Sequence, residues 1–306
     1  MNKISFKILM LLTILVMHKG KAQEKQLTSK LEIYNITSGT REVIYEEKDH
    51  FEAPNWSTDG SYLIFNQNGL LYKLPLQNPK KIHIPTGQAD RCNNDHGISP
   101  DGRTLAISNN DKIEGVSGGT SRIYTLPVEG GTPKLITPDY PSYWHGWSPD
   151  GKYLVYTARR NGDYDIYRIP AVGGEETRLT TAPGLDDGPE YSPDGKYIYY
   201  NSMESGKMEI WRMSPDGSQK EQLTNDSYSN WFAHPSPTRE HFVYIAYLED
   251  QGDRHPPMKE VALRLFDLKT KNIQTLCTFT GGQGTINVPS WSPDGERFAF
   301  VSYEEN

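Results

Sequence analysis

The pentapeptide Trp147-Ser148-Pro149-Asp150-Gly151, with the run Tyr153-Leu154-Val155-Tyr156 behind it, is one copy of a unit that recurs along this 306-residue chain. In such a turn, proline sets the backbone angle at its position, aspartate accepts hydrogen bonds from the nearby backbone, and glycine adopts a left-handed conformation. The run that follows is rich in aromatic and β-branched residues, as half-buried strands are. Each copy therefore predicts a tight turn that leads into a strand.

Six copies of this turn follow one another at similar intervals. Their serines are Ser57, Ser99, Ser148, Ser192, Ser236 and Ser292, so neighbouring copies are 42, 49, 44, 44 and 56 residues apart. The fifth copy, Pro235-Ser236-Pro237-Thr238, is degenerate. Because this period is that of one four-stranded propeller blade, we predict an all-β fold, a six-bladed β-propeller.

The two ends of the chain are predicted to share the last blade. Only one strand, residues 297–302, follows the sixth turn, whereas residues 31–35 and 41–45 are predicted to form two strands without inner partners. Pairing these segments completes the blade and removes the open edges of the ring. Residues 23–306 are then expected to form a single domain.

Composition and the first residues restrict the partners and the compartment. With 39 acidic and 32 basic side chains the net charge is −7, which argues against binding of nucleic acid. Lys3 and Lys7 precede a short apolar run at residues 8–16, and residues 20–22 suit a signal-peptidase site. We therefore expect residues 1–22 to be a cleaved signal peptide and the protein to be periplasmic or secreted. No later apolar run is long enough for a transmembrane segment in the mature chain.

The two cysteines and the missing nucleotide motifs narrow the chemistry further. The first cysteine is Cys92, which lies too far along the chain for a lipoprotein signal. Because Cys92 and Cys277 fall in different repeats, we expect two separate thiols. No Walker or dinucleotide fingerprint is present, so no organic cofactor is expected. The sequence contains no Gly-x-Ser-x-Gly motif, and the repeated serines belong to the turns, so a serine nucleophile is not expected. We expect a monomer.

The repeated turn and the strand after it resemble those of the TolB-type β-propeller family, and the resemblance extends over residues 31–303. Polar cassettes at residues 93–97, 143–146 and 281–287 are similar to those of short exported bacterial TolB-like proteins that lack the N-terminal domain of TolB itself. The resemblance implies the fold and export, and it implies no particular reaction. Oligogalacturonate lyases are similar in their propeller repeats and use a histidine-rich metal site, whose ligands have no assigned counterparts in this chain.

Candidate functional residues precede the turns. The innermost strand of a blade runs along the central channel into its turn, so the segments before the turns and the loops after the second strands are expected at one mouth of the channel. In blades two to five, counted from the turn at Ser57, these segments are polar. The predicted catalytic or metal-binding residues are His96, His145, Glu190 and His234. The predicted ligand-binding residues are Arg91, Asn93, Asn94, Asp95, Tyr143, Trp144, Asp186, Asp187, Asn230, Trp231, Gln283 and Asn287.

Two functions are compatible with this set. Imidazole and carboxylate groups suit one divalent ion, Zn²⁺, Mn²⁺ or Ca²⁺, or a general acid and base. Aromatic rings beside amides suit a sugar. We therefore expect a small polar ligand, a carbohydrate, with metal-assisted lyase or hydrolase chemistry. The alternative is a non-catalytic interaction scaffold of the cell envelope that binds a peptide segment of another protein, in which the polar groups satisfy loop backbones and hold water in the channel.

Two further features bear on the site. Residues 249–260 contain the longest insertion, on the same face, and are a candidate lid or specificity loop. His96 and His145 stand three residues before their serines, whereas Glu190 and His234 stand two before theirs. Because side chains alternate along a strand, these four need not point the same way.

Overall fold

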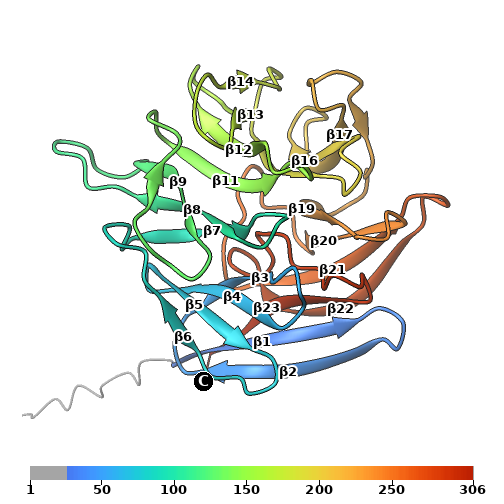
Figure 1. The fold of residues 1–306 in the computed structure, drawn as a ribbon. Helices are drawn as coiled ribbons and strands as arrows, with labels where there is room; N and C mark the ends of the chain where they lie inside the picture. The colour runs from blue at the N-terminus through green and yellow to red at the C-terminus, as the bar shows by residue number, and fades with distance from the viewer. Residues whose placement is uncertain (1–25, 306) are drawn as a thin grey trace, which may run out of the picture.

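The computed structural model describes residues 26–305, which form 23 strands and no α-helix (Figure 1). The predicted signal peptide, residues 1–22, lies outside the described residues. Blade one holds β3 (Glu52–Trp56), β4 (Tyr62–Gln67), β5 (Leu70–Pro75) and β6 (Ile82–Ile84), and blade two holds β7 (Cys92–Ile98), β8 (Thr104–Asn110), β9 (Ser121–Pro127) and β10 (Lys134–Leu135). Blade three holds β11 (Ser142–Trp147), β12 (Tyr153–Arg159), β13 (Tyr164–Pro170) and β14 (Thr177–Arg178). Blade four holds β15 (Asp186–Tyr191), β16 (Ile198–Ser202), β17 (Glu209–Met213) and β18 (Glu221–Gln222), and blade five holds β19 (Ser229–Pro235), β20 (His241–Tyr247), β21 (Lys259–Asp267) and β22 (Ile273–Gly281).

The sixth blade joins the two ends of the chain, which confirms the predicted closure. β23 (Arg297–Glu305) pairs antiparallel with β1 (Leu27–Asn35), and β1 pairs with β2 (Thr40–Glu47). Figure 1 shows the blue N-terminal strands beside red β23. The innermost position of this blade is reduced to a single bridge between Trp291 and Phe298. The six-bladed all-β propeller predicted from the repeats is thus confirmed.

Each repeated turn is held by its own side chains. In the third copy the Ser148 hydroxyl donates to Asp150 Oδ1 at 2.7 Å and accepts from the Tyr153 amide at 2.9 Å. The same aspartate oxygen accepts from the Lys152 amide at 3.1 Å, and Gly151 has a φ of 70°. These bonds involve only residues of the motif, so the turn forms wherever the motif occurs.

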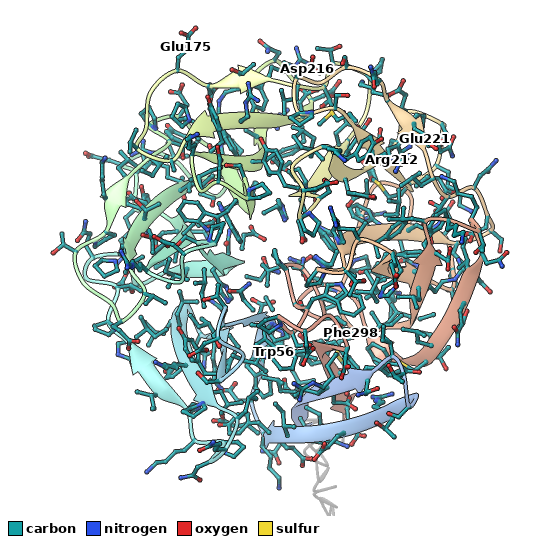
Figure 2. All side chains as sticks on the ribbon, turned by 45° about the vertical axis from the view of Figure 1, so that its right-hand side comes forward. Trp56, Glu175, Arg212, Asp216, Glu221 and Phe298 are labelled. Atoms are coloured by element: carbon teal, nitrogen blue, oxygen red, sulfur yellow. The ribbon has the colours of Figure 1, made fainter. Side chains whose placement is uncertain are left out.

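The core lies within and between adjacent blades, and charged side chains lie on the outside. Figure 2 shows Trp56 and Phe298 inside the ring, where both are buried, and Glu175 and Asp216 at its outer edge, where both are exposed. Cys92 and Cys277 are both free, as expected. Residues 26–305 contain no helix of the length and apolarity that crossing a membrane requires.

Five of the innermost strands carry a β-bulge near the cavity end. The register shifts lie between Glu52 and Asn55 in β3, Cys92 and His96 in β7, Trp144 and Gly146 in β11, Asp187 and Glu190 in β15, and Trp231 and His234 in β19. A bulge bends its strand and redirects side chains, and bulges are common beside functional sites. The alternation expected along these strands is therefore interrupted where the candidate site lies.

Candidate functional site at the channel mouth

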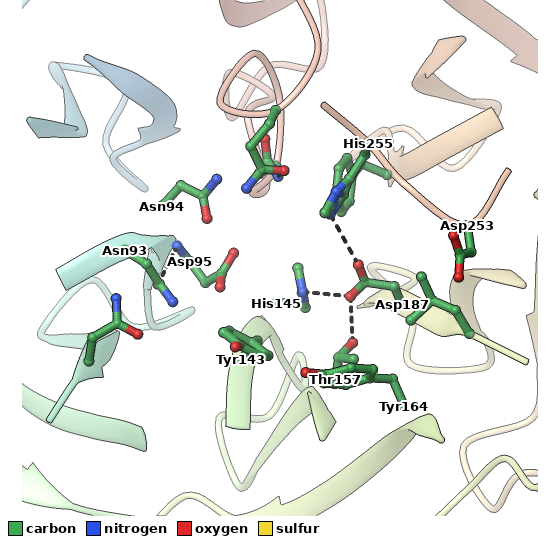
Figure 3. Close-up of a pocket in the computed structure, with 15 residues that line it drawn as sticks. Asn93, Asn94, Asp95, Tyr143, His145, Thr157, Tyr164, Asp187, Asp253 and His255 are labelled. Atoms are coloured by element: carbon green, nitrogen blue, oxygen red, sulfur yellow. Dashed lines mark hydrogen bonds and ion pairs between the residues drawn. The ribbon is translucent and has the colours of Figure 1, made fainter. Parts of the chain in front are cut away.

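A cavity of about 520 Å³ opens at the predicted mouth of the channel (Figure 3). Its wall contains five amide side chains, those of Asn93, Asn94, Asn110, Gln283 and Asn287. Three aromatic rings also line it, Tyr143, Tyr164 and Phe232, as do Thr157 and Leu185. The carboxyl and imidazole groups of the wall are those of Asp95, His145, Asp187, Asp253 and His255.

Asp187 is the most heavily bonded of these groups. Its Oδ1 accepts from the Thr157 hydroxyl at 2.7 Å and from the Gly188 amide at 2.8 Å, and it lies 3.2 Å from His145 Nε2. Its Oδ2 lies 3.6 Å from His255 Nε2, and Figure 3 shows these side-chain contacts converging on Asp187. Burial alone would raise the pKa of Asp187, but the hydrogen bond and charge of His145 outweigh it and lower the pKa to about 2.

His145 is the imidazole partner of Asp187. Burial alone would lower its pKa, but the hydrogen bond to Asp187 and the negative charges of Asp95 and Asp187 raise it above the ordinary value. His145 and Asp187 therefore stabilise each other's charged forms. The ring of His145 also stacks on that of Phe232, with centroids 6.0 Å apart.

Asp95 lies beside this pair but has no cation of its own. Its carboxyl group makes no hydrogen bond to any of residues 26–305, and the residue is 5% exposed, toward the cavity. Burial raises the pKa of Asp95 to about 7, and the negative charge of Asp187 adds to the effect of burial. Glu52 of β3 stands nearby, and burial and the charge of Asp95 raise its pKa to about 7 as well. Asp95 is thus the wall carboxyl group that can gain or lose a proton near neutral pH.

The insertion between β20 and β21 reaches the rim of the cavity. The ring of His255 packs on Trp231 and Phe232, with centroids 4.5 and 5.3 Å away. The Tyr247 hydroxyl donates to the Pro256 carbonyl at 2.9 Å and so anchors the loop. Gly282 approaches the same carbonyl so closely that a Cβ there would overlap it, and its φ of 118° also requires glycine. The glycine cluster of residues 281–284 therefore accommodates this loop.

Eight of the predicted site residues line the cavity: Asn93, Asn94, Asp95, Tyr143, His145, Asp187, Gln283 and Asn287. The other predicted residues lie elsewhere. Arg91 is exposed and lines a neighbouring groove with Lys112. Trp144 and Trp231 are buried in the core, and Trp231 supports the ring of His255 from beneath. Asp186 is buried behind the wall, and Asn230 donates to Glu209 at 2.7 Å.

The predicted set of four metal ligands is engaged in contacts within the protein. His96 is fully buried, and its Nε2 lies 3.5 Å from the Ile64 carbonyl. His234 is occupied at both ring nitrogens, with Nδ1 2.6 Å from Glu190 Oε2 and Nε2 2.6 Å from the Ile286 carbonyl. Within residues 26–305, no group of three or more His, Cys, Asp or Glu side chains is arranged to hold a metal ion. A divalent ion bound by these four residues stays a prediction from the sequence.

Sequence reasoning missed Asn110, Thr157, Tyr164, Leu185, Phe232, Asp253 and His255, all of which line the cavity. The insertion at residues 249–260 was a usable signal for Asp253 and His255. Phe232 gave none, because an apolar residue in a strand is expected in the core. Its φ of 52° within the β19 bulge is what brings its ring to the cavity.

Comparisons with known proteins place this chain beside TolB-type propellers. The TolB β-propeller domain family matches residues 140–254. An uncharacterised protein of Agrobacterium fabrum is 50% identical over 278 residues, which cover 90% of this chain and 93% of that protein. The structure of a TolB-type protein from Agrobacterium tumefaciens is 47% identical, with a TM-score of 0.86 over 92% of this chain and 99% of that chain.

More distant solved structures share the fold. TolB from Acinetobacter baumannii is 17% identical with a TM-score of 0.63, over 90% of this chain and 66% of that chain. An oligogalacturonate lyase from Vibrio parahaemolyticus is 14% identical with a TM-score of 0.53, over 89% of this chain and 78% of that chain. At these identities the likeness concerns the propeller alone.

Proposed function

Because this chain belongs to the TolB-type β-propeller family and the fold specifies no reaction, we propose its function from the axial cavity. The protein binds a small hydroxyl-rich ligand, a carbohydrate, at the channel mouth. The size of the cavity supports this, because about 520 Å³ lies within the range of roughly 300–1,000 Å³ typical of small-molecule sites.

The composition of the wall is the observation that carries the proposal. A sugar ring presents hydroxyl groups that both donate and accept hydrogen bonds, and it presents apolar C–H faces. Five amide side chains of the wall offer donors and acceptors together. The neighbouring rings of Tyr143 and Tyr164, with centroids 6.3 Å apart, offer faces on which a sugar ring packs.

A ligand screen tests the proposal. Untagged protein is assayed by thermal shift and then by calorimetry against hexoses, N-acetylhexosamines, hexosamines and hexuronates. We expect at least one class to raise the melting temperature and to bind with a stoichiometry of one. If no saccharide in the panel binds, the proposal is wrong.

A matched pair of tyrosine variants locates the binding to the cavity. Tyr164→Ala removes a wall ring, whereas Tyr140→Ala removes an exposed ring that does not line the cavity. Loss of one ring contact is expected to weaken binding about two- to tenfold, and the Tyr140 variant is expected to bind as the unchanged protein does. Equal affinities of the two variants would place the ligand elsewhere.

The reaction, the divalent ion, the export and the monomeric state stay predictions from the sequence. Metal analysis of untagged protein tests the ion directly. The interaction scaffold that binds a peptide segment stays the alternative, and a protein that ignores every saccharide would favour it.

A further inference from the structure

We infer that the ligand of the axial cavity carries a positively charged amine, so that the site prefers amino sugars to neutral sugars and excludes sugar carboxylates. The inference rests on the proposed function and names the ligand class of that same cavity. The charged side chains of the cavity wall leave negative charge without a paired cation.

The wall of the cavity contains carboxylates but no strong cation. Among the described residues that line it, none is Lys or Arg. His145 is already paired with Asp187, and burial lowers the pKa of His255, so that this imidazole is neutral at neutral pH. The carboxyl groups of Asp95 and Asp253 remain, and neither makes a side-chain hydrogen bond or ion pair within residues 26–305.

Asp95 is the central group of this argument. It is 5% exposed, it lies on the cavity wall, and the bulge of β7 directs it there. The charged and titratable groups around it are Glu52 of β3, Tyr143 and His145 of β11, and Asp187 of β15. Among them only His145 can become a cation near neutral pH, and its Nε2 already lies 3.2 Å from Asp187 Oδ1. A buried carboxylate without its own cation is costly, and a ligand ammonium group would offset that cost.

The remaining wall suits the rest of such a ligand. Asp253 lies on the opposite side of the cavity from Asp95 in Figure 3, so negative potential extends across the mouth. The faces of Tyr143, Tyr164 and Phe232 attract cations as well as C–H groups. A sugar carboxylate would instead meet like charges without a compensating Lys or Arg in the described wall, and like-charge contacts oppose binding.

Four sugars of nearly the same shape test the inference by calorimetry: D-glucosamine, N-acetyl-D-glucosamine, D-glucose and D-glucuronate. Acetylation removes the charge of the amine and keeps its nitrogen. We expect D-glucosamine to bind at least tenfold more tightly than D-glucose and N-acetyl-D-glucosamine, and D-glucuronate to bind most weakly.

Aspartate variants connect the preference to the wall. Asp95→Asn should lose the tenfold preference for D-glucosamine over D-glucose, and its circular dichroism spectrum and urea unfolding report whether it is folded. Asp253→Asn, in an exposed loop position, should lower the preference without affecting folding. Asp90→Asn is the matched control, because Asp90 is exposed and does not line the cavity.

The outcomes separate the two proposals. If D-glucuronate binds as tightly as D-glucosamine, or if Asp95→Asn keeps the preference, the charge inference is overturned and the carbohydrate proposal stands. If none of the four sugars binds and the wider saccharide panel is also inert, both proposals are overturned.

Discussion

Replacing Asp95 with asparagine should make the ligand-free protein more stable above neutral pH. Its pKa of about 7 lies about three units above the ordinary value of 3.8, because the carboxyl group is buried next to Asp187. A group that binds its proton more tightly in the folded state than in the unfolded state loses stability as the pH rises between the two pKa values. Unchanged protein should therefore become less stable between about pH 4 and about pH 7, and the loss should be complete above that range.

The size of the effect follows from the same values. Each unit of pKa difference corresponds to about 1.4 kcal/mol, so ionising Asp95 costs up to about 4 kcal/mol. The asparagine amide is itself incompletely hydrogen-bonded in this position, which costs about 1–3 kcal/mol. The net expectation is a gain of about 1–3 kcal/mol for Asp95→Asn at about pH 8, with little or no gain at about pH 4.

Urea unfolding followed by tryptophan fluorescence at a series of pH values measures both quantities. The variant should show a flatter dependence of unfolding free energy on pH, and Asp90→Asn should match the unchanged protein. Should Asp95→Asn be less stable than the unchanged protein at both ends of the range, Asp95 would be a structural residue and the reasoning would be refuted. A stabilising substitution at a wall position is typical of residues kept for function.

Three other predictions concern stability and reactivity. Glu190→Ala removes the buried contact between Glu190 Oε2 and His234 Nδ1 and leaves that ring nitrogen without a partner, so we expect a loss of about 1–3 kcal/mol in urea unfolding. Glu190→Gln keeps a hydrogen bond to the ring and should cost less, with unchanged ligand affinity. Loss of binding with unchanged stability would assign the two residues to the binding site. Gly97→Ala would put a Cβ 2.6 Å from Cζ3 of Trp144 and closer still to its Cη2, so we expect a loss of about 1–3 kcal/mol; a melting temperature equal to that of the unchanged protein would contradict this packing. Burial raises the pKa of Cys92 to about 12 and that of Cys277 to about 11. Both thiols should therefore react with a disulfide reagent only after unfolding. Rapid labelling of native protein would contradict this prediction.

The Gly97 contact illustrates a limit of sequence reasoning. Trp144 lies in a polar segment of the sequence, and it was predicted to be a ligand-binding residue. In the structure its ring covers Gly97 of the preceding blade and forms part of the core between blades two and three. The sequence contains both residues, but their contact depends on how two blades pack.

The histidines illustrate a second limit. His145 lies within the bulge of β11 and faces the cavity, whereas His96 and His234 follow the bulges of β7 and β19 and are enclosed. Counting residues back from the turn assumes an uninterrupted strand. A bulge adds a residue on one side of the ladder, so equal offsets no longer mean equal directions.

The residues of the chain were sufficient to predict six blades and their closure by the N-terminal strands, because each repeated turn is stabilised within its own motif and the period counts the blades. Eight of the fifteen residues of the cavity wall were predicted from the sequence, and the other seven were not. Phe232 reaches it through a bulge, and His255 reaches it through an insertion that packs across the mouth against Trp231. The directions of these side chains are set by contacts between segments far apart in the chain, and such contacts exist only once the ring has closed.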